Sequence, residues 1–261
     1  MKTRIIFGLL LFPLVVILIN MGGWALRAAL FVVSTIALYE LDRALFATKT
    51  RFVYWGFLAL AVYYWFLPQS LAYFFPFLLL WMLLNMVAMV FTYPRLTPSL
   101  VFASAVLPIY SGVFLSTIYL IRAVNTYWVW LIFAGAWGSD IFAYFVGKAL
   151  GKHKLIPDLS PNKTREGAMG GVLGGALVGI AYWYILNLLG IHTESPWVFA
   201  LICMVLAMFS QLGDLAASAI KRHMDIKDFG KLIPGHGGIM DRFDSVLVVA
   251  PILYVFLLFY L

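Results

Sequence analysis

Long apolar stretches recur along the whole chain, and they constrain its fold more than any other feature. A helix that crosses a bilayer needs about 20 mostly apolar residues. Nine stretches qualify as candidates: 5–20, 24–42, 53–67, 71–92, 99–120, 128–147, 170–190, 197–220 and 244–261. Only 11% of the residues are charged, whereas soluble domains usually carry about 25%. The sequence therefore predicts an all-α, polytopic integral membrane protein with about nine transmembrane helices, and it excludes a soluble domain.

The basic residues predict how these helices are oriented. With the N-terminus in the cytoplasm and nine alternating spans, sixteen of the eighteen Lys and Arg residues fall on the cytoplasmic side, and only Arg27 and Arg122 fall outside. Cytoplasmic loops of membrane proteins carry such an excess of basic residues. Topology thus accounts for the formal net charge of +7, and we expect no nucleic-acid partner.

The polar connections indicate where chemistry can take place. The longest hydrophilic segments are 148–168 and 221–243, and both fall on the cytoplasmic side of the predicted topology. We therefore divide the chain into N-terminal transmembrane helices, 1–127, and a C-terminal catalytic region, 128–261. Any active site is expected at the cytoplasmic face or within the bilayer just below it.

Two carboxylates lie inside predicted spans. Asp140 and Asp214 are each six or seven residues from the cytoplasmic ends of their spans, which places both roughly 10 Å below the same surface. Acids at that depth are costly and usually face a cavity, a partner or a pathway; a salt bridge that only supports packing is the alternative. Helical spacing adds Ser218 and Lys221 to the face of Asp214, and Tyr144 to the face of Asp140. Tyr144 is equally well explained as an interface anchor.

The connection between the last two predicted spans combines cations, acids and glycines. Its charged residues are Lys221, Arg222, Lys227, Asp228, Lys231, Asp241, Arg242 and Asp244, and Gly235, Gly237 and Gly238 flank His236. Clustered cations with accessible backbone amides suit phosphate. Clustered carboxylates suit Mg²⁺, which is typically shared between one or two protein carboxylates and substrate phosphates. This combination predicts a metal–nucleotide site. A basic loop near anionic lipid would explain the cations but not the acids and glycines.

The other cytoplasmic segment offers further candidate phosphate ligands. Lys163 and Arg165 suit that role, although basic residues are also expected here from topology alone. The Gly-Lys pairs at 147–148 and 151–152 lack the spacing of a Walker A loop, so we exclude a P-loop. Glycines at four-residue intervals over 167–179 predict close helix packing.

The segment 218–244 resembles the signature of the bacterial phosphatidate cytidylyltransferases, also called CDP-diacylglycerol synthases. The signature positions are met by Ser218, Lys221, Arg222, Lys227, Asp228, Gly230, Pro234, His236, Gly237, Gly238, Asp241, Arg242 and Asp244. Upstream, Gly213-Asp214-Leu215, Ser160-Pro161-x-Lys163-Thr164 and the segment from Asp140 to Gly147 also resemble the family. The resemblance is strong from about 137 to 245. One departure is Ala217, where family members usually carry Glu.

The resemblance implies that CTP and phosphatidate react to give CDP-diacylglycerol and pyrophosphate. It further implies a Mg²⁺ requirement, a homodimer, and a location in the bacterial cell (inner) membrane with the active site facing the cytoplasm. Asp214 and Asp241 would hold the metal, and we add Asp244 as a candidate ligand. The reaction we expect is in-line attack of a phosphatidate oxygen on the α-phosphorus of CTP.

The remaining candidate residues are assigned to charge neutralisation and substrate binding. Lys221, Arg222 and Arg242 would neutralise phosphate charge, and His236 would position a substrate. The other predicted substrate-binding residues are Ser218, Lys227, Asp228, Gly237, Gly238, Lys163, Thr164, Asp140 and Tyr144. Two alternatives stay within lipid chemistry: a CTP-dependent kinase of polyprenol type, or an impaired relative that lacks the glutamate at 217. A transporter would need charge at the midplane and on both faces, which this sequence lacks.

The predicted sidedness can be tested by cysteine labelling. In a Cys203→Ala background, Lys231→Cys should react with a membrane-impermeant maleimide only after lysis, because its segment carries much of the basic excess. Glu194→Cys lies in the predicted outer segment 191–196 and should react in intact cells. Labelling of position 231 without lysis would contradict the orientation.

Overall fold

Helices make up most of the described part of the protein. A computed structural model describes residues 2–46, 52–67, 74–94, 97–191, 194–232, 235 and 237–260. The chain packs as two compact units. The first contains residues 1–116 and 228–240, and the second contains residues 117–227 and 241–261. These units describe packing, and the proposed division into N-terminal helices, 1–127, and a catalytic region, 128–261, stays a prediction.

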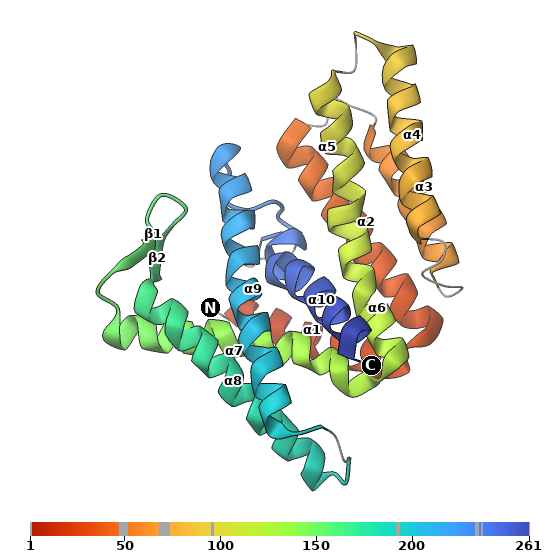
Figure 1. Ribbon diagram of the computed structural model, residues 1–261. Coiled ribbons are helices and arrows are strands. Elements are labelled where there is room, and N and C mark those ends of the chain that lie inside the picture. Colours follow the sequence, from red (N-terminus) through yellow and green to blue (C-terminus); the bar gives the residue numbers. More distant parts are fainter. Residues whose placement is uncertain are drawn as a thin grey trace. The chain divides into compact units, whose positions relative to one another are not determined.

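The first unit is a set of helices joined by short connections (Figure 1). Its helices are α1 (Lys2–Met21), α2 (Gly23–Phe46), α3 (Phe52–Phe66), α4 (Phe74–Thr92) and α5 (Pro98–Pro108). A π-helical turn, η2 (Ile109–Val113), joins α5 to α6 (Phe114–Val124), which continues into the second unit. Within this turn the Gly112 carbonyl accepts a hydrogen bond from the Tyr64 hydroxyl at 3.0 Å. The bond thus gives a partner to a backbone carbonyl in the π-helical turn, where the regular α-helical hydrogen bonding is interrupted.

The second unit contains four long helices and a hairpin. Its elements after α6 are α7 (Thr126–Leu150), β1 (Lys154–Ile156), β2 (Ser160–Thr164), α8 (Arg165–Leu188), α9 (Pro196–His223) and α10 (Met240–Tyr260). β1 and β2 pair antiparallel, with Lys154 opposite Thr164 and Ile156 opposite Ser160. The hairpin joins α7 to α8 (Figure 1). Both strands lie in the hydrophilic segment 148–168, for which the sequence predicts a cytoplasmic connection and no strands.

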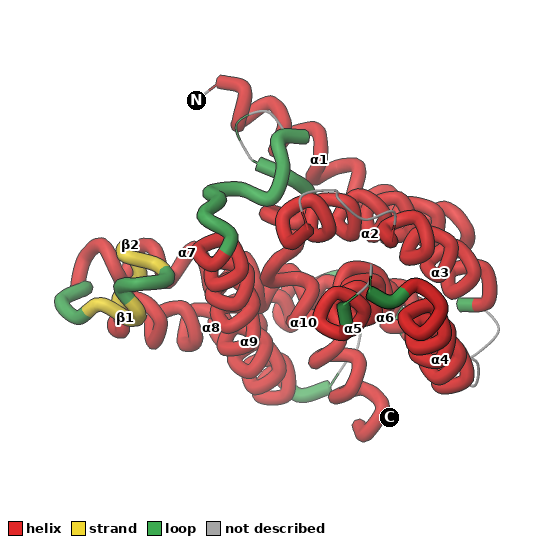
Figure 2. Tube along the Cα trace, turned by 90° about the horizontal axis from the view of Figure 1, so that it is seen from above, coloured by secondary structure: helices red, strands yellow, loops and turns green. Residues whose placement is uncertain are grey.

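Glycines allow α8 to approach α7 and α9 closely, and Figure 2 shows the three helices side by side. A Cβ atom at Gly175 would lie 2.8 Å from the Ala207 Cβ and 3.0 Å from the Cys203 carbonyl oxygen. A Cβ at Gly171 would lie 2.9 Å from the Ser139 carbonyl oxygen. The predicted close packing through the glycines at 167–179 is therefore confirmed.

Seven helices in the described part of the chain are long and apolar enough to cross a membrane. They are α2, the segment Phe75–Thr92 of α4, the continuous helix Pro98–Val124, α7, α8, α9 and α10. This confirms an all-α polytopic membrane protein. Helices also occupy the other two predicted ranges, as α1 and α3, but α3 has only 15 residues. The predicted number of nine spans is therefore not confirmed.

The glycine packing generates a stability prediction. Gly175→Leu should lower the free energy of unfolding by about 1–3 kcal/mol, because the added side chain has no space between α8 and α9. Leu173 on the same helix is 62% exposed, so Leu173→Val is the matched control and should have little effect. Thermal unfolding in detergent would measure both variants, and an unchanged midpoint for Gly175→Leu would contradict the proposed packing.

Candidate active site

Asp214 lies at the centre of a cluster of charged side chains in the second unit. The Lys163 ammonium, at the end of β2, forms an ion pair with the Asp214 carboxylate on α9. Asp140 on α7 and Asp244 on α10 are both close enough to interact electrostatically with Asp214. Three helices and the hairpin therefore bring three acids and one cation together. The sequence-based expectation that Asp140 and Asp214 share one region of the protein is confirmed.

A glycine explains how α10 comes so close to Asp214. A Cβ atom at Gly213 would lie 2.8 Å from the Asp244 carbonyl oxygen and 3.2 Å from the Ser245 Cα. Any side chain larger than hydrogen would push the two helix backbones apart. The Gly-Asp pair at 213–214 thus combines a close helix contact with a functional carboxylate.

A second ion pair joins the end of α9 to the start of α10. The Lys221 Nζ lies 2.9 Å from the Asp241 Oδ1, and these side chains are only 14% and 2% exposed. Asp241 stands in the first turn of α10, where the helix dipole favours a negative charge. Because both groups are largely removed from solvent, this ion pair compensates charges that would be costly to bury alone.

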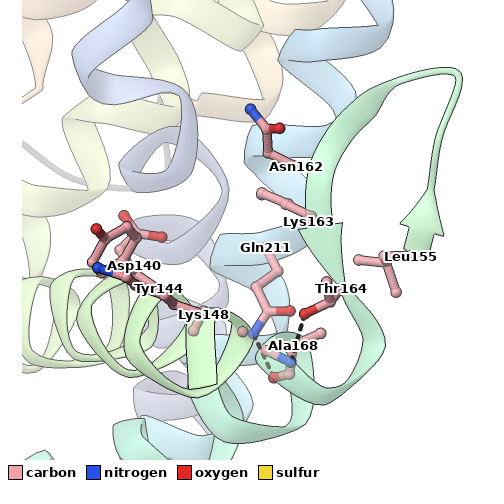
Figure 3. A pocket seen from close by; sticks show the side chains of 12 residues that line it. Asp140, Tyr144, Lys148, Leu155, Asn162, Lys163, Thr164, Ala168 and Gln211 are labelled. Carbon is pink, nitrogen blue, oxygen red and sulfur yellow. Dashed lines mark hydrogen bonds between the residues drawn. The ribbon is translucent and has the colours of Figure 1, made fainter. Parts of the chain in front are cut away.

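A cavity of about 470 Å³ adjoins the charged cluster, and several charged and polar side chains line it. Figure 3 shows its lining, which consists of Asp140, Ala143, Tyr144, Gly147, Lys148, Leu155, Asn162, Lys163, Thr164, Gly167, Ala168 and Gln211. These residues come from α7, the hairpin, α8 and α9. Four predicted substrate-binding residues, Asp140, Tyr144, Lys163 and Thr164, therefore line one cavity.

Several cavity residues also hold the surrounding elements in place. The Gln211 Nε2 donates to the Ser139 Oγ and to the Ala168 carbonyl oxygen, each at 3.0 Å, and so links α9 to α7 and α8. The Thr164 Oγ1 accepts the Gly167 N–H at 3.1 Å and caps α8. Lys148 lies over the Tyr144 ring, 5.9 Å from its centroid. Helical spacing placed Lys148 on the face of Asp140 and Tyr144, and it lines the cavity with them. Sequence reasoning missed Gln211 and Asn162 as cavity residues, since neither carries a motif of its own.

The signature loop, residues 228–240, belongs to the first unit. It contains the predicted binding residues Asp228, Gly237 and Gly238, of which Gly238 is buried. Gly237 has a φ of +84°, a conformation that favours glycine. His236 lies outside the described residues, as do Ile233 and Pro234. The predicted role of His236 therefore stays a prediction.

The remaining predicted residues lie near the end of α9 and the start of α10. Ser218 is half-buried on α9, and Arg222, Lys227 and Arg242 are exposed. The Arg222 Nε donates to the Leu159 carbonyl oxygen in the hairpin at 3.5 Å. Ala217 is fully buried. Because the residue is alanine, this position provides no carboxylate. The substrate and catalytic roles of these residues stay predictions.

The sequence is similar to those of known proteins along nearly its whole length. Residues 2–260 match the cytidylyltransferase family. The chain is 35% identical to a phosphatidate cytidylyltransferase of Bacillus subtilis, in an alignment that covers 97% of this chain and 96% of the relative. It is 34% identical to a phosphatidate cytidylyltransferase of Staphylococcus haemolyticus, with 99% of each chain covered. The chain belongs to the cytidylyltransferase family and is therefore a nucleotidyltransferase.

The buried ion pair between Lys221 and Asp241 generates a second stability prediction. Lys221→Met should lower the free energy of unfolding by about 3–5 kcal/mol, because Asp241 would lose its paired charge. Lys227→Met, at an exposed position, is the control and should change it by less than about 0.5 kcal/mol.

A double variant tests whether the unpaired charge is the cause. Lys221→Met combined with Asp241→Leu should recover most of the stability lost in Lys221→Met, because no buried charge then remains. Thermal unfolding in detergent would measure each variant. A double variant less stable than Lys221→Met alone would contradict this explanation.

Proposed function

We propose that this protein transfers CMP from CTP to phosphatidate, giving CDP-diacylglycerol and pyrophosphate in the bacterial cell (inner) membrane. The observation that carries the proposal is the cluster of lysine-paired carboxylates beside a cavity with charged side chains in its lining, in a chain that belongs to the cytidylyltransferase family. The relatives named phosphatidate cytidylyltransferase align over nearly the full length of the chain.

The surroundings of the cavity suit an amphiphilic substrate. Lys148, Asn162 and Lys163 offer donors for a phosphate group. On α7, Ile141 and Phe145 are 55% and 63% exposed, although this helix has the composition of a membrane span. An exposed apolar surface on such a helix suits acyl chains. The phosphatidate headgroup would enter the cavity while its chains stay in the lipid.

The lysine–carboxylate pairs suit a reaction between two anions. CTP and phosphatidate both carry phosphate charge, so the protein must neutralise and align them. Lys163 and Lys221 would each pass from a carboxylate to a phosphate when the substrates bind, assisted by the exposed Arg222 and Arg242. The phosphatidate oxygen then attacks the α-phosphorus, a new P–O bond forms, and the α–β anhydride bond breaks to release pyrophosphate. Phosphatidate is already ionised near neutral pH, so no strong general base is needed.

The donor set is also compatible with Mg²⁺. Among the described residues, no three side chains of His, Cys, Asp or Glu are grouped so that they could hold a metal by themselves. Mg²⁺ does not require such a group, because it usually binds one or two protein carboxylates together with substrate phosphates. Of the three predicted ligands, Asp214, Asp241 and Asp244, a pair that includes Asp214 would hold the ion together with substrate phosphates. When bound, it would offset the negative charge of the phosphates.

Sidedness and assembly complete the proposal. The charged cluster would face the cytoplasm, where CTP is found, and the distribution of basic residues supports this orientation. We also propose a homodimer, which rests on the resemblance to the bacterial enzymes alone.

Product analysis with labelled CTP tests the proposed reaction. Purified protein with phosphatidate, Mg²⁺ and [α-³²P]CTP should give labelled CDP-diacylglycerol together with pyrophosphate. Label transferred to the lipid from [γ-³²P]CTP would instead identify a CTP-dependent kinase. Formation of neither product would overturn the proposal and would favour an impaired relative.

The metal assignment generates a prediction for activity. Asp214→Asn is nearly isosteric, so it should keep the fold yet lower turnover by at least about a hundredfold, because a carboxylate ligand is lost. Chelation of Mg²⁺ should stop the wild-type reaction, and added Mg²⁺ should restore it. Asp158→Asn, at an exposed position of the hairpin, is the matched control. Full Mg²⁺-dependent turnover in Asp214→Asn would remove Asp214 from the ligand set.

A further inference from the structure

Glu40 is a buried acid in α2, and its carboxylate binds the start of α10. Glu40 is only 5% exposed. The Glu40 Oε2 accepts the Met240 N–H at 2.8 Å, and the Oε1 accepts the Ile239 N–H at 3.1 Å. Amides in the first turn of a helix have no carbonyl partner within that helix. Glu40 therefore caps α10 from a position 200 residues earlier in the chain.

Two glycines of the signature loop pack directly against the same carboxylate. A Cβ atom at Gly238 would lie 2.3 Å from the Glu40 Oε1 and 2.4 Å from its Oε2. A Cβ at Gly230 would lie 2.2 Å from the Glu40 Oε1 and 3.1 Å from the Gly238 Cα. Gly230, near the start of the loop, and Gly238, near its end, thus both lie against the Glu40 carboxylate. A side chain at either position would meet the Glu40 carboxylate, which would have to shift from its present place.

The charge of Glu40 matches what it binds. A carboxylate only accepts hydrogen bonds, and the Ile239 and Met240 groups that donate to it are backbone N–H groups. A negative charge at the beginning of a helix is also favoured by the helix dipole. A glutamine would fit the same space but would direct an N–H₂ group toward one of the two backbone N–H groups. The contact therefore depends on the carboxylate and not only on the volume of the side chain.

We infer that Glu40 is a positioning residue for the reaction: it holds the signature loop and fixes the first turn of α10. The residues that follow Met240 in that helix are Asp241, Arg242 and Asp244, which are predicted to hold metal and phosphate. An error in the start of α10 would displace all three from their productive positions. Glu40 itself touches no substrate. This inference rests on the proposed cytidylyltransferase reaction only for its kinetic consequence, since the loop contact stands by itself.

The first experiment replaces the carboxylate without changing its size. Glu40→Gln should lower kcat by about ten- to a hundredfold, the factor expected for loss of a charge-assisted hydrogen bond, while KM for phosphatidate stays near the wild-type value. Trypsin should cleave the released loop at the exposed Lys231 faster than in the wild type. Glu40→Asp keeps the charge and should retain more of both properties than Glu40→Gln.

The matched control removes another buried polar contact of the same helix. The Ser34 Oγ lies 2.8 Å from the Tyr64 hydroxyl, and Ser34 is fully buried. Ser34→Ala should lower the unfolding temperature but leave kcat and the rate of cleavage at Lys231 unchanged. If Ser34→Ala reproduced the effects of Glu40→Gln, the role of Glu40 would be general stability and the inference would fail.

A double-mutant cycle tests the contact from the side of the loop. Gly238→Ala alone should displace the carboxylate and release the loop. Glu40→Ala combined with Gly238→Ala should be no worse than Glu40→Ala alone, because the clash then has no partner. Independent effects that multiply in the double variant would overturn the inference. Should Glu40→Gln fail to fold, Gly238→Ala and the double variant carry the same test.

The two proposals fail in distinguishable ways. A wild-type protein that makes no CDP-diacylglycerol would overturn the proposed function. The proteolysis rates and unfolding temperatures in the cycle would still show whether Glu40 holds the loop. Wild-type activity together with unchanged kcat and unchanged cleavage in Glu40→Gln would overturn the inference about Glu40 alone.

Discussion

A carboxylate inside an apolar helix needs a partner, and the organisation of the second unit follows from this requirement. Asp214 belongs to α9, which has the composition of a membrane span, and Lys163 reaches it from β2. An acid at such a position is costly without a compensating group. The hairpin, which carries the lysine, is therefore part of the charged site and not only a connection between α7 and α8. Lys221 and Asp241 meet the same requirement at the ends of α9 and α10.

These ion pairs have a chemical consequence as well as a structural one. The Lys163–Asp214 pair is partly exposed and the Lys221–Asp241 pair is largely buried. Ion pairs contribute little net stability in either setting, so their presence is better explained by the use of the charges. In the proposed reaction, each lysine would leave its carboxylate for a substrate phosphate, and the released carboxylate would become available to a cation. Each of the two ion pairs would be neutral before the substrates bind, and its charges would stay compensated after they bind.

Glycine gives the helices the proximity that this arrangement needs. Gly213 brings the backbone of α10 within reach of α9 beside Asp214, and the glycines of α8 bring it against α7 and α9. In the first unit, Gly230 and Gly238 make room for the Glu40 carboxylate. Within membrane-spanning bundles, small residues permit the close van der Waals contacts that replace a hydrophobic driving force. In this protein the same small residues place charged groups near one another.

The sequence by itself determined the helical class, the stretches that form the helices, the glycine packing and most of the candidate site residues. These features depend on local composition and spacing, or on a signature of consecutive residues such as 218–244. The tertiary structure alone decided which charges pair. Hydropathy does not show that Lys163 pairs with Asp214, which lies 51 residues away in the chain. A single short hairpin also has no distinctive composition by which the sequence could predict it.

Glu40 shows the same limit most clearly. Its position inside an apolar stretch could have marked it, as it marked Asp140 and Asp214. Its partners could not have been found in this way, because they are backbone amides about 200 residues away. Backbone groups are the same at every position, so only the path of the folded chain determines which of them a buried carboxylate will bind.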